Sequence, residues 1–130
     1  MDELKLTLPN KKEYVVSARL AATSFASIAG FNVDQIEDIR LAVGEACNNA
    51  VLHSTSSSTI DIEMFLEADR FVVVINDHGI GFEYKGIEDI NPLDYEGSGL
   101  GLFIIKSLMD EVYLDSVENK GTTIRMIKRK

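Results

Sequence analysis

Cysteine is almost absent from this sequence of 130 residues, since Cys47 is its only copy. A single thiol excludes an internal disulfide framework and is typical of a protein from a reducing compartment. Basic residues are also scarce, because 13 Lys and Arg stand against 21 Asp and Glu and leave a net charge of -8. Proteins that bind nucleic acid neutralise its phosphates with Lys and Arg, so we expect no direct contact with nucleic acid.

Long apolar runs are missing as well, because no segment approaches the roughly 20 apolar residues that cross a bilayer. The chain begins with Met1, Asp2 and Glu3 rather than with the basic and apolar regions of a signal peptide. We therefore expect a cytoplasmic protein that does not associate with membranes. The hydrophobic content of 45% is ordinary for a globular protein, and the length predicts a single domain over residues 1–130.

Alternating hydrophobicity predicts five strands. Short turns separate the second strand from the third and the fourth from the fifth, which indicates two antiparallel hairpins. The strands are expected at residues 4–8, 60–66, 71–75, 112–116 and 122–127.

Apolar residues at helical spacing predict three helices. The first begins at a capping box formed by Asn10 and Glu13, the second begins at a capping box formed by Asn32 and Gln35, and the third covers residues 100–109. The predicted fold class is therefore α+β. We expect a two-layer α/β sandwich in which helices cover one face of a mixed, mostly antiparallel sheet.

Two polar side chains share one face of the second predicted helix. Glu45 and Asn49 are four residues apart, so they lie one turn from each other. An amide oxygen is a hard ligand that suits Mg²⁺, and a neighbouring carboxylate can accept a proton. The exposed polar face of an amphipathic helix would show the same pattern, and the pair by itself favours that interpretation.

An aspartate ends the third predicted strand, in the segment Asn76-Asp77-His78-Gly79-Ile80-Gly81. A carboxylate at a strand end, here Asp77, can accept a hydrogen bond from an exocyclic amine. Gly79 and Gly81 would let the backbone approach a ligand closely. A simple turn that closes the strand explains these residues about equally well.

A glycine-rich run, Gly97-Ser98-Gly99-Leu100-Gly101, opens the third predicted helix. Backbone N–H groups at a helix start can point at phosphate oxygens, and the helix dipole favours an anion there. A dinucleotide-binding fold requires such a run directly after an early strand, and this run comes late in the chain after a long loop. The run also lacks the Gly-Lys-Ser/Thr ending of a P-loop. The hydrophobicity of the preceding residues 82–96 has no sustained period, so we expect a loop there. A loop of this length is typically functional, for example a lid.

These three segments, followed by Gly121-Thr122-Thr123, resemble in their order the ATP-binding domains of the GHKL superfamily, which includes gyrase and the histidine kinases. The resemblance covers essentially the whole chain and is strongest to the bacterial anti-sigma-factor serine-protein kinases. It implies a sandwich of the Bergerat type that binds ATP and Mg²⁺, with residues 82–96 as the ATP lid.

The resemblance also implies a role for each matching position. Glu45 would be the general base, and Asn49 would coordinate Mg²⁺. Asp77 would accept a hydrogen bond from the adenine amine, with Gly79 and Gly81 shaping its pocket. The remaining nucleotide-binding positions would be Gly97, Ser98, Gly99, Leu100 and Gly101 at the phosphates and Thr122 beside adenine.

The same resemblance implies partners and a reaction. Such a kinase binds a sigma factor, transfers the γ-phosphate of ATP to a serine of an anti-anti-sigma protein of the STAS type, and forms a homodimer. Two alternatives stay open: a module that binds ATP and sequesters the sigma factor without phosphate transfer, and a stand-alone ATPase. The pair of Glu45 and Asn49 favours the kinase, because binding alone needs no base.

Overall fold

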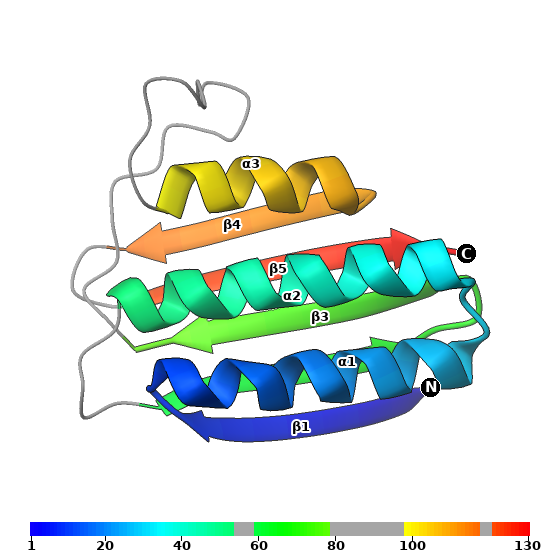
Figure 1. The fold of residues 1–130 in the computed structure, drawn as a ribbon, viewed down its shortest axis with the longest axis horizontal. Helices are drawn as coiled ribbons and strands as arrows, with labels where there is room; N and C mark the ends of the chain where they lie inside the picture. The colour runs from blue at the N-terminus through cyan, green and yellow to red at the C-terminus, as the bar shows by residue number, and fades with distance from the viewer. Residues whose placement is uncertain (54–58, 79–97, 118–120) are drawn as a thin grey trace.

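A computed structural model describes residues 1–53, 59–78, 98–117 and 121–130 of the chain. A five-stranded sheet with the order β1-β2-β3-β5-β4 is covered on one face by a layer of helices (Figure 1). The strands are β1 (Asp2–Pro9), β2 (Thr59–Leu66), β3 (Arg70–Asp77), β4 (Glu111–Val117) and β5 (Gly121–Arg129). The helices are the 3-10 turn η1 (Lys12–Tyr14), α1 (Val15–Ala29), α2 (Val33–His53) and α3 (Ser98–Leu108).

All four strand pairings of this sheet are antiparallel, which confirms the predicted α+β class. Strands β2 and β3 form the first predicted hairpin, and β4 and β5 form the second. Because β5 also pairs with β3, it lies between β3 and β4. Alternate residues of each strand point toward the helices. The buried ones on this side are Ile60, Ile62, Met64, Phe71, Val73, Ile75, Ile124 and Met126.

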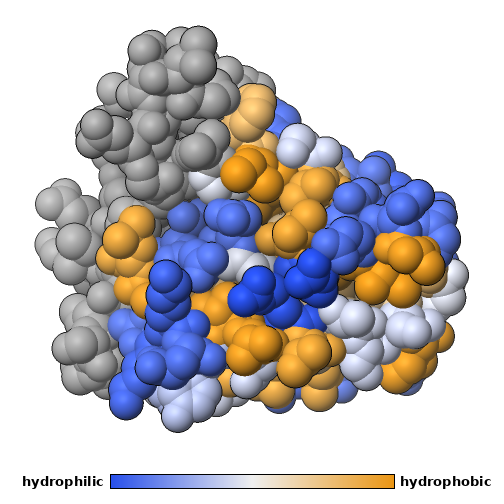
Figure 2. Space-filling view, viewed as in Figure 1, coloured by the Kyte–Doolittle hydropathy of each residue, from blue (hydrophilic) through white to orange (hydrophobic). Residues whose placement is uncertain are grey.

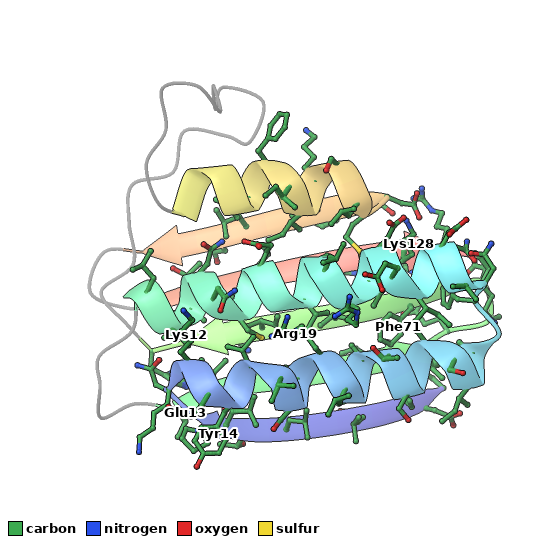
Figure 3. The ribbon with its side chains drawn as sticks, viewed as in Figure 1. Lys12, Glu13, Tyr14, Arg19, Phe71 and Lys128 are labelled. Atoms are coloured by element: carbon green, nitrogen blue, oxygen red, sulfur yellow. The ribbon has the colours of Figure 1, made fainter. Side chains whose placement is uncertain are left out.

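Helices α1 and α2 pack on the sheet through the apolar stripes that their sequences predict. The buried residues of these stripes are Val15, Ala18, Ala22 and Ala26 on α1, and Ile39, Val43, Ala46 and Ala50 on α2. Phe71 of β3 reaches the helix layer (Figure 3) and meets Phe25 and Phe31 edge-on, at ring-centroid distances of 6.0 and 6.4 Å. Small residues on α1 thus let the helix approach the sheet, and the aromatic cluster fills the space near its C-terminal end.

The two long helices begin in different ways. Asn32 and Gln35 form the predicted capping box, because Gln35 N donates to Asn32 Oδ1 at 2.8 Å and Asn32 N donates to Gln35 Oε1 at 3.0 Å. The capping box predicted at Asn10 and Glu13 is wrong. The 3-10 turn η1 lies between Asn10 and α1, and the cap residue is Tyr14, which makes no side-chain cap hydrogen bond.

The third helix, α3, begins at Ser98 and ends at Leu108, so the predicted helix is confirmed with an earlier start. The predicted lid at residues 82–96 lies outside the described residues and stays a prediction. In the part of the chain that the structure describes, no helix is both long and apolar enough to span a membrane.

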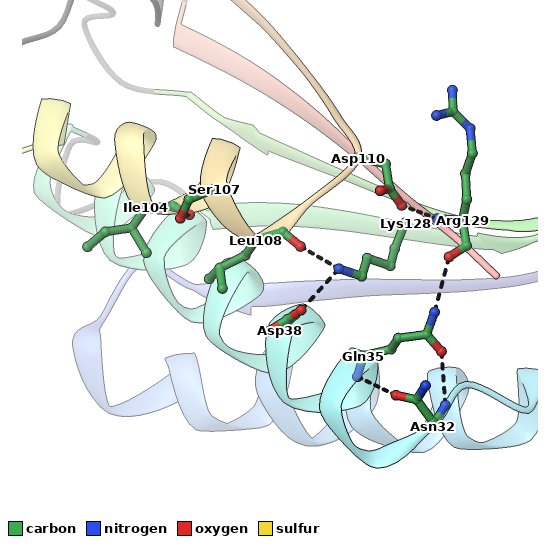
Figure 4. Close-up of polar contacts among 9 residues, drawn as sticks. All are labelled: Asn32, Gln35, Asp38, Ile104, Ser107, Leu108, Asp110, Lys128 and Arg129. Atoms are coloured by element: carbon green, nitrogen blue, oxygen red, sulfur yellow. Dashed lines mark hydrogen bonds and ion pairs between the residues drawn. The ribbon is translucent and has the colours of Figure 1, made fainter.

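A lysine of β5 ties the sheet to two helices (Figure 4). The Lys128 side chain is 12% exposed, and its Nζ lies 3.1 Å from Asp38 Oδ2 on α2. The same Nζ donates to the carbonyl oxygen of Leu108, the last residue of α3, at 2.6 Å. A cation at a helix C-terminus satisfies a carbonyl that has no partner within the helix and interacts favourably with the helix dipole. Lys128 therefore fixes the end of α3 relative to α2.

Candidate nucleotide-binding site

The predicted motifs meet at one end of the sandwich, where α2 ends, α3 begins, and β3 and β5 lie side by side (Figure 1). The strand register places Asp77 of β3 opposite Thr122 of β5. Helix α3 packs along α2, so its first turn lies near the C-terminal half of that helix. Segments that are far apart in the sequence thus contribute to one surface.

Gly101, in the first turn of α3, lies directly against the polar pair on α2. A Cβ at position 101 would lie 3.2 Å from both Oδ1 and Nδ2 of Asn49 and 3.2 Å from Oε2 of Glu45. A side chain at this position would therefore push these groups back by a few tenths of an ångström. The absence of a Cβ lets the α3 backbone approach Glu45 and Asn49, and the structure brings the first and third motifs together.

The Asn49 carboxamide has an unsatisfied atom. Its Nδ2 is buried and has no hydrogen-bond partner among the described residues. A buried donor without a partner lowers the free energy of unfolding by about 1–3 kcal/mol. When a native protein retains such a donor, the donor often has a function. A ligand that reorients or engages this carboxamide would remove that cost.

The oxygen atoms of Glu45 and Asn49 suit a magnesium ion that also binds a nucleotide. An amide oxygen from Asn49 and a carboxylate from Glu45 are hard oxygen donors of the kind that Mg²⁺ prefers. Across the described ranges, no group of three or more His, Cys, Asp or Glu side chains could hold a metal ion. Mg²⁺ at Asn49 would share its remaining coordination positions with nucleotide phosphates and water, as Mg²⁺ usually does in kinase sites.

Asp77 lies at the end of β3 and is 7% exposed. The Thr122 backbone N–H donates to Asp77 Oδ1 at 3.2 Å, which orients the carboxylate. The preceding residue, Gly121, has a φ of +89°, and a Cβ there would lie 2.2 Å from the backbone oxygen of Asp77. Both the positive φ and this close approach require glycine at position 121.

A small apolar pocket of about 20 Å³ lies between α2, α3 and the sheet. Its walls are aliphatic, with Asn49, Asp77 and Thr122 as the polar residues. A pocket of this size holds about one water molecule, so a planar heterocycle such as adenine could use this apolar lining and donate a hydrogen bond to Asp77 only after the surrounding side chains move apart. The full lining is Ala46, Asn49, Ala50, Ile75, Asp77, Leu102, Leu114, Thr122 and Ile124.

The glycine-rich run forms the first turn of α3 rather than a loop before it. Ser98, Gly99, Leu100 and Gly101 all have helical backbone. The first four N–H groups of a helix have no partner within the helix, and they carry the positive end of its dipole. This turn therefore offers an anion site beside Asn49. The predicted site residues outside the described part of the chain are Gly79, Gly81 and Gly97.

Sequence reasoning missed the pocket wall. Leu102, Leu114 and Ile124 line the pocket, but the sequence predicts them only as parts of a helix and two strands. Hydrophobicity cannot distinguish a pocket wall from the core. Sequence reasoning also missed a contact outside the pocket, between His78 Nε2 and Asp61 Oδ2 at 2.8 Å, which depends on the pairing of β2 with β3 and not on a local motif.

Cys47 lies near these residues on α2 but has no reactive character. The residue is only 1% exposed. Burial raises the pKa of the Cys47 thiol from 9.0 to about 12, and the nearby positive charge of Arg19 only partly opposes this effect. A thiol that stays protonated at neutral pH is a poor nucleophile, so Cys47 is a core residue.

Comparison with known sequences identifies relatives over nearly the whole chain. The family of the histidine kinase-like ATPase domain matches residues 8–128. A protein named serine-protein kinase RsbW from Halalkalibacterium halodurans is 34% identical, over 98% of this chain and 83% of its own length. The proteins of the same name from Bacillus cereus and Bacillus velezensis are each 33% identical over 98% of this chain, and the matches cover 84% and 86% of their lengths.

Comparison with solved structures supports the fold. The structure of the RsbU and RsbW domains of a Mycobacterium tuberculosis protein has a TM-score of 0.75 at 20% identity, covering 99% of this chain and 32% of that chain. The histidine kinase domain of a blue-light activated kinase from Erythrobacter litoralis has a TM-score of 0.60 at 20% identity, covering 93% of this chain and 61% of that one. At these identities the likeness concerns the fold alone.

Proposed function

We propose, on the premise that this chain belongs to the RsbW family of serine-protein kinases within the histidine kinase-like ATPases, that it transfers the γ-phosphate of ATP to a serine of a protein partner. The family match spans residues 8–128, and the 34% identity extends over 98% of the chain. Beyond this family membership, we propose that Mg²⁺ takes part, and we propose roles for individual residues and the identity of the partners.

The contact of Gly101 with Glu45 and Asn49 is the observation that carries this proposal. It brings a carboxylate, a carboxamide and the N–H groups of a helix start to one place, which supports the roles of base, metal ligand and phosphate site proposed for them. A binding protein without catalysis would need a phosphate site but not a carboxylate beside it. The arrangement therefore favours phosphate transfer over simple sequestration.

The nucleotide lies with adenine against the apolar lining beside Asp77, where the small pocket widens to admit it. Asp77 accepts a hydrogen bond from the exocyclic amine, and Thr122 lies beside it. The first turn of α3 holds the phosphates through backbone N–H groups, and Asn49 would hold Mg²⁺. Mg²⁺, when bound, neutralises negative charge on the phosphate oxygens. The protein thus supplies mainly position and electrostatic stabilisation, as phosphoryl transfer requires.

Glu45 acts on the acceptor. Its carboxylate orients the incoming serine hydroxyl and accepts the proton as the serine oxygen forms a bond to the γ-phosphorus. The bond between the γ-phosphorus and the oxygen that bridges to the β-phosphate breaks, and ADP leaves with that oxygen. The products are a phosphoserine on the partner and ADP.

The partners proposed for the chain are a sigma factor, which it binds, and an anti-anti-sigma protein of the STAS type, which it phosphorylates. The names of the RsbW relatives support a protein substrate. A net charge of -8 argues against direct contact with nucleic acid. We propose that the kinase is a homodimer and that it binds both partners in the cytoplasm.

The experiment is incubation of the purified chain with labelled ATP, Mg²⁺ and the anti-anti-sigma protein encoded nearest to it. Glu45→Ala should abolish labelling of the partner and largely retain nucleotide affinity, whereas Asp77→Asn should weaken nucleotide binding at least tenfold. Glu37→Ala is the matched control, because this exposed carboxylate lies on the same helix and pairs with Arg40. Normal labelling by both site variants would refute the site, and ATP binding without labelling by the unchanged protein would favour sequestration.

A further inference from the structure

Helices α2 and α3 lie side by side and run in opposite directions (Figure 1), and two contacts define how they are aligned. At the first, the Gly101 contact, Gly101 of α3 lies against Glu45 of α2. At the second, the Lys128 bridge, Lys128 Nζ lies 2.6 Å from the carbonyl oxygen of Leu108 on α3 and 3.1 Å from Asp38 Oδ2 on α2 (Figure 4). The Lys128 bridge therefore ties together the same two helices that form the candidate site.

The Gly101 contact and the Lys128 bridge belong to one register of the two helices. On α2, Glu45 follows Asp38 by seven residues. On α3, Gly101 precedes Leu108 by seven residues. Seven residues make two helical turns, a rise of about 10 Å on either helix. Because α2 and α3 are antiparallel, the alignment that forms the Lys128 bridge is the same alignment that forms the Gly101 contact.

Apolar packing holds α3 in place but does not by itself fix this register. Leu102 and Ile105 are buried beneath the helix, and Figure 2 shows further apolar side chains, in orange, over α3. Apolar attraction is non-directional, so it tolerates a small shift of the helix along its axis. Hydrogen bonds depend steeply on distance and angle. The Lys128 bridge therefore determines at which level of α2 the helix α3 ends.

The candidate site tolerates little displacement of α3. A Cβ at position 101 would already lie 3.2 Å from Glu45 Oε2 and from both polar atoms of the Asn49 carboxamide, so only a few tenths of an ångström are free there. A slip of α3 by one residue along its axis would be a shift of about 1.5 Å. Misplacement of reacting groups by about 1 Å can lower a reaction rate by about 100-fold. The register of the two helices is thus critical for the site.

We propose that Lys128 is a positioning residue for phosphate transfer. By fixing the register of α3 on α2, it sets the distance from the first turn of α3 to Glu45 and Asn49. This inference rests on the proposed function, because it concerns the same site. Lys128 acts from a distance, since its Nζ lies at Leu108, about 10 Å along α3 from Gly101. An ammonium at that distance makes no hydrogen bond to a phosphate at the first turn.

The first test measures the nucleotide affinity of Lys128→Met, which keeps an unbranched side chain but removes the ammonium. Its affinity for MgATP should fall at least fivefold, whereas its affinity for adenosine, which has no phosphates, should change less than twofold. Arg129→Met is the matched control and should bind both like the unchanged protein, because it removes the same charge from an exposed neighbour that pairs with Glu111 of β4. Circular dichroism verifies that each variant is folded at the assay temperature. Full MgATP affinity in Lys128→Met, an equal loss of adenosine affinity, or an equal loss in Arg129→Met would overturn the proposal.

The second test determines whether Lys128 acts through α2. Asp38→Ala removes the acceptor on α2 and should also weaken MgATP binding. A chain with both Asp38→Ala and Lys128→Met should bind MgATP within about twofold of Lys128→Met alone, because both changes break the same bridge. Losses that multiply in the double variant would show that the two residues act separately, and would refute a role through the register of α2 and α3.

The rate at which a protein partner is labelled at saturating MgATP separates this inference from the proposed function. Lys128→Met should lower that rate at least tenfold, because saturation restores the bound nucleotide but not its alignment with Glu45. A full labelling rate in Lys128→Met would contradict only the role of Lys128. If the unchanged protein binds MgATP but labels no partner, phosphate transfer is refuted, and a lower MgATP affinity of Lys128→Met would still support its role in placing the phosphates. An unchanged protein that binds no MgATP would refute both proposals.

Discussion

Replacing Asn49 with leucine should stabilise the nucleotide-free protein while abolishing its binding of nucleotide. The buried Nδ2 of Asn49 has no partner among the described residues, and such a donor costs about 1–3 kcal/mol. Leucine is similar in size and is a better helix former by a few tenths of a kcal/mol. We therefore expect the free energy of unfolding to rise by about 1–3 kcal/mol, which corresponds to an increase in Tm of about 3–10 °C for a domain of this size.

Thermal unfolding with and without MgATP measures both effects. MgATP should raise the Tm of the unchanged protein, because it binds only the folded chain, and should leave the Tm of Asn49→Leu unchanged. Asn48→Leu is the control, since this neighbour is exposed and its replacement removes no buried donor. A lower Tm for nucleotide-free Asn49→Leu would refute the argument that the orphaned donor is costly. A shift with MgATP as large as in the unchanged protein would exclude Asn49 from the site.

Three further predictions concern other parts of the molecule. Gly101→Ala should weaken nucleotide binding at least tenfold in a fluorescence titration, because the new Cβ would lie 3.2 Å from the Asn49 carboxamide and shift it. The free energy of unfolding should change little, since alanine adds about 1 kcal/mol of helix propensity; normal affinity would contradict the role of this close approach. Asn32→Ala should lower the free energy of unfolding by about 1 kcal/mol in urea, with no change in nucleotide affinity, because it removes a cap at the opposite end of α2. The Cys47 thiol, whose pKa rises from 9.0 to about 12 on folding, should make the unfolding free energy fall with pH. Between these values the unfolded chain loses a proton that the folded chain keeps, so stability should decrease by about 1.4 kcal/mol per pH unit relative to Cys47→Ala, and equal slopes would contradict the burial effect.

The sequence predicts the elements of this fold well, because each depends on local chemistry. The box of Asn32 and Gln35 forms as expected, since both side chains reach the free N–H groups of the same turn. The same spacing at Asn10 and Glu13 forms no box, because the chain makes a 3-10 turn before α1 begins. A capping pattern therefore identifies a helix start only where the backbone enters the helix directly.

The arrangement of the site is less accessible from sequence. The positions of Glu45, Asn49 and Asp77 could be named from motifs, but their distances depend on the packing of α3 on α2 and on the order of strands. The pairing of β3 with β5 is not implied by any hairpin, since α3 and β4 lie between these strands in the chain. The approach of Gly101 to Glu45 is likewise a result of helix packing, and no local pattern encodes it.

The insertion of β5 between β3 and β4 has a consequence for how the protein is made. A nascent chain can form α1, α2 and the β2–β3 hairpin early, but one edge of β3 stays unpaired until residues up to Arg129 leave the ribosome. That edge belongs to the apolar run that contains Val72 and Val73, so it is prone to mispairing during synthesis. Because Thr122 of the proposed site arrives on the same strand, we expect ATP to bind only the finished domain and not to assist its early folding.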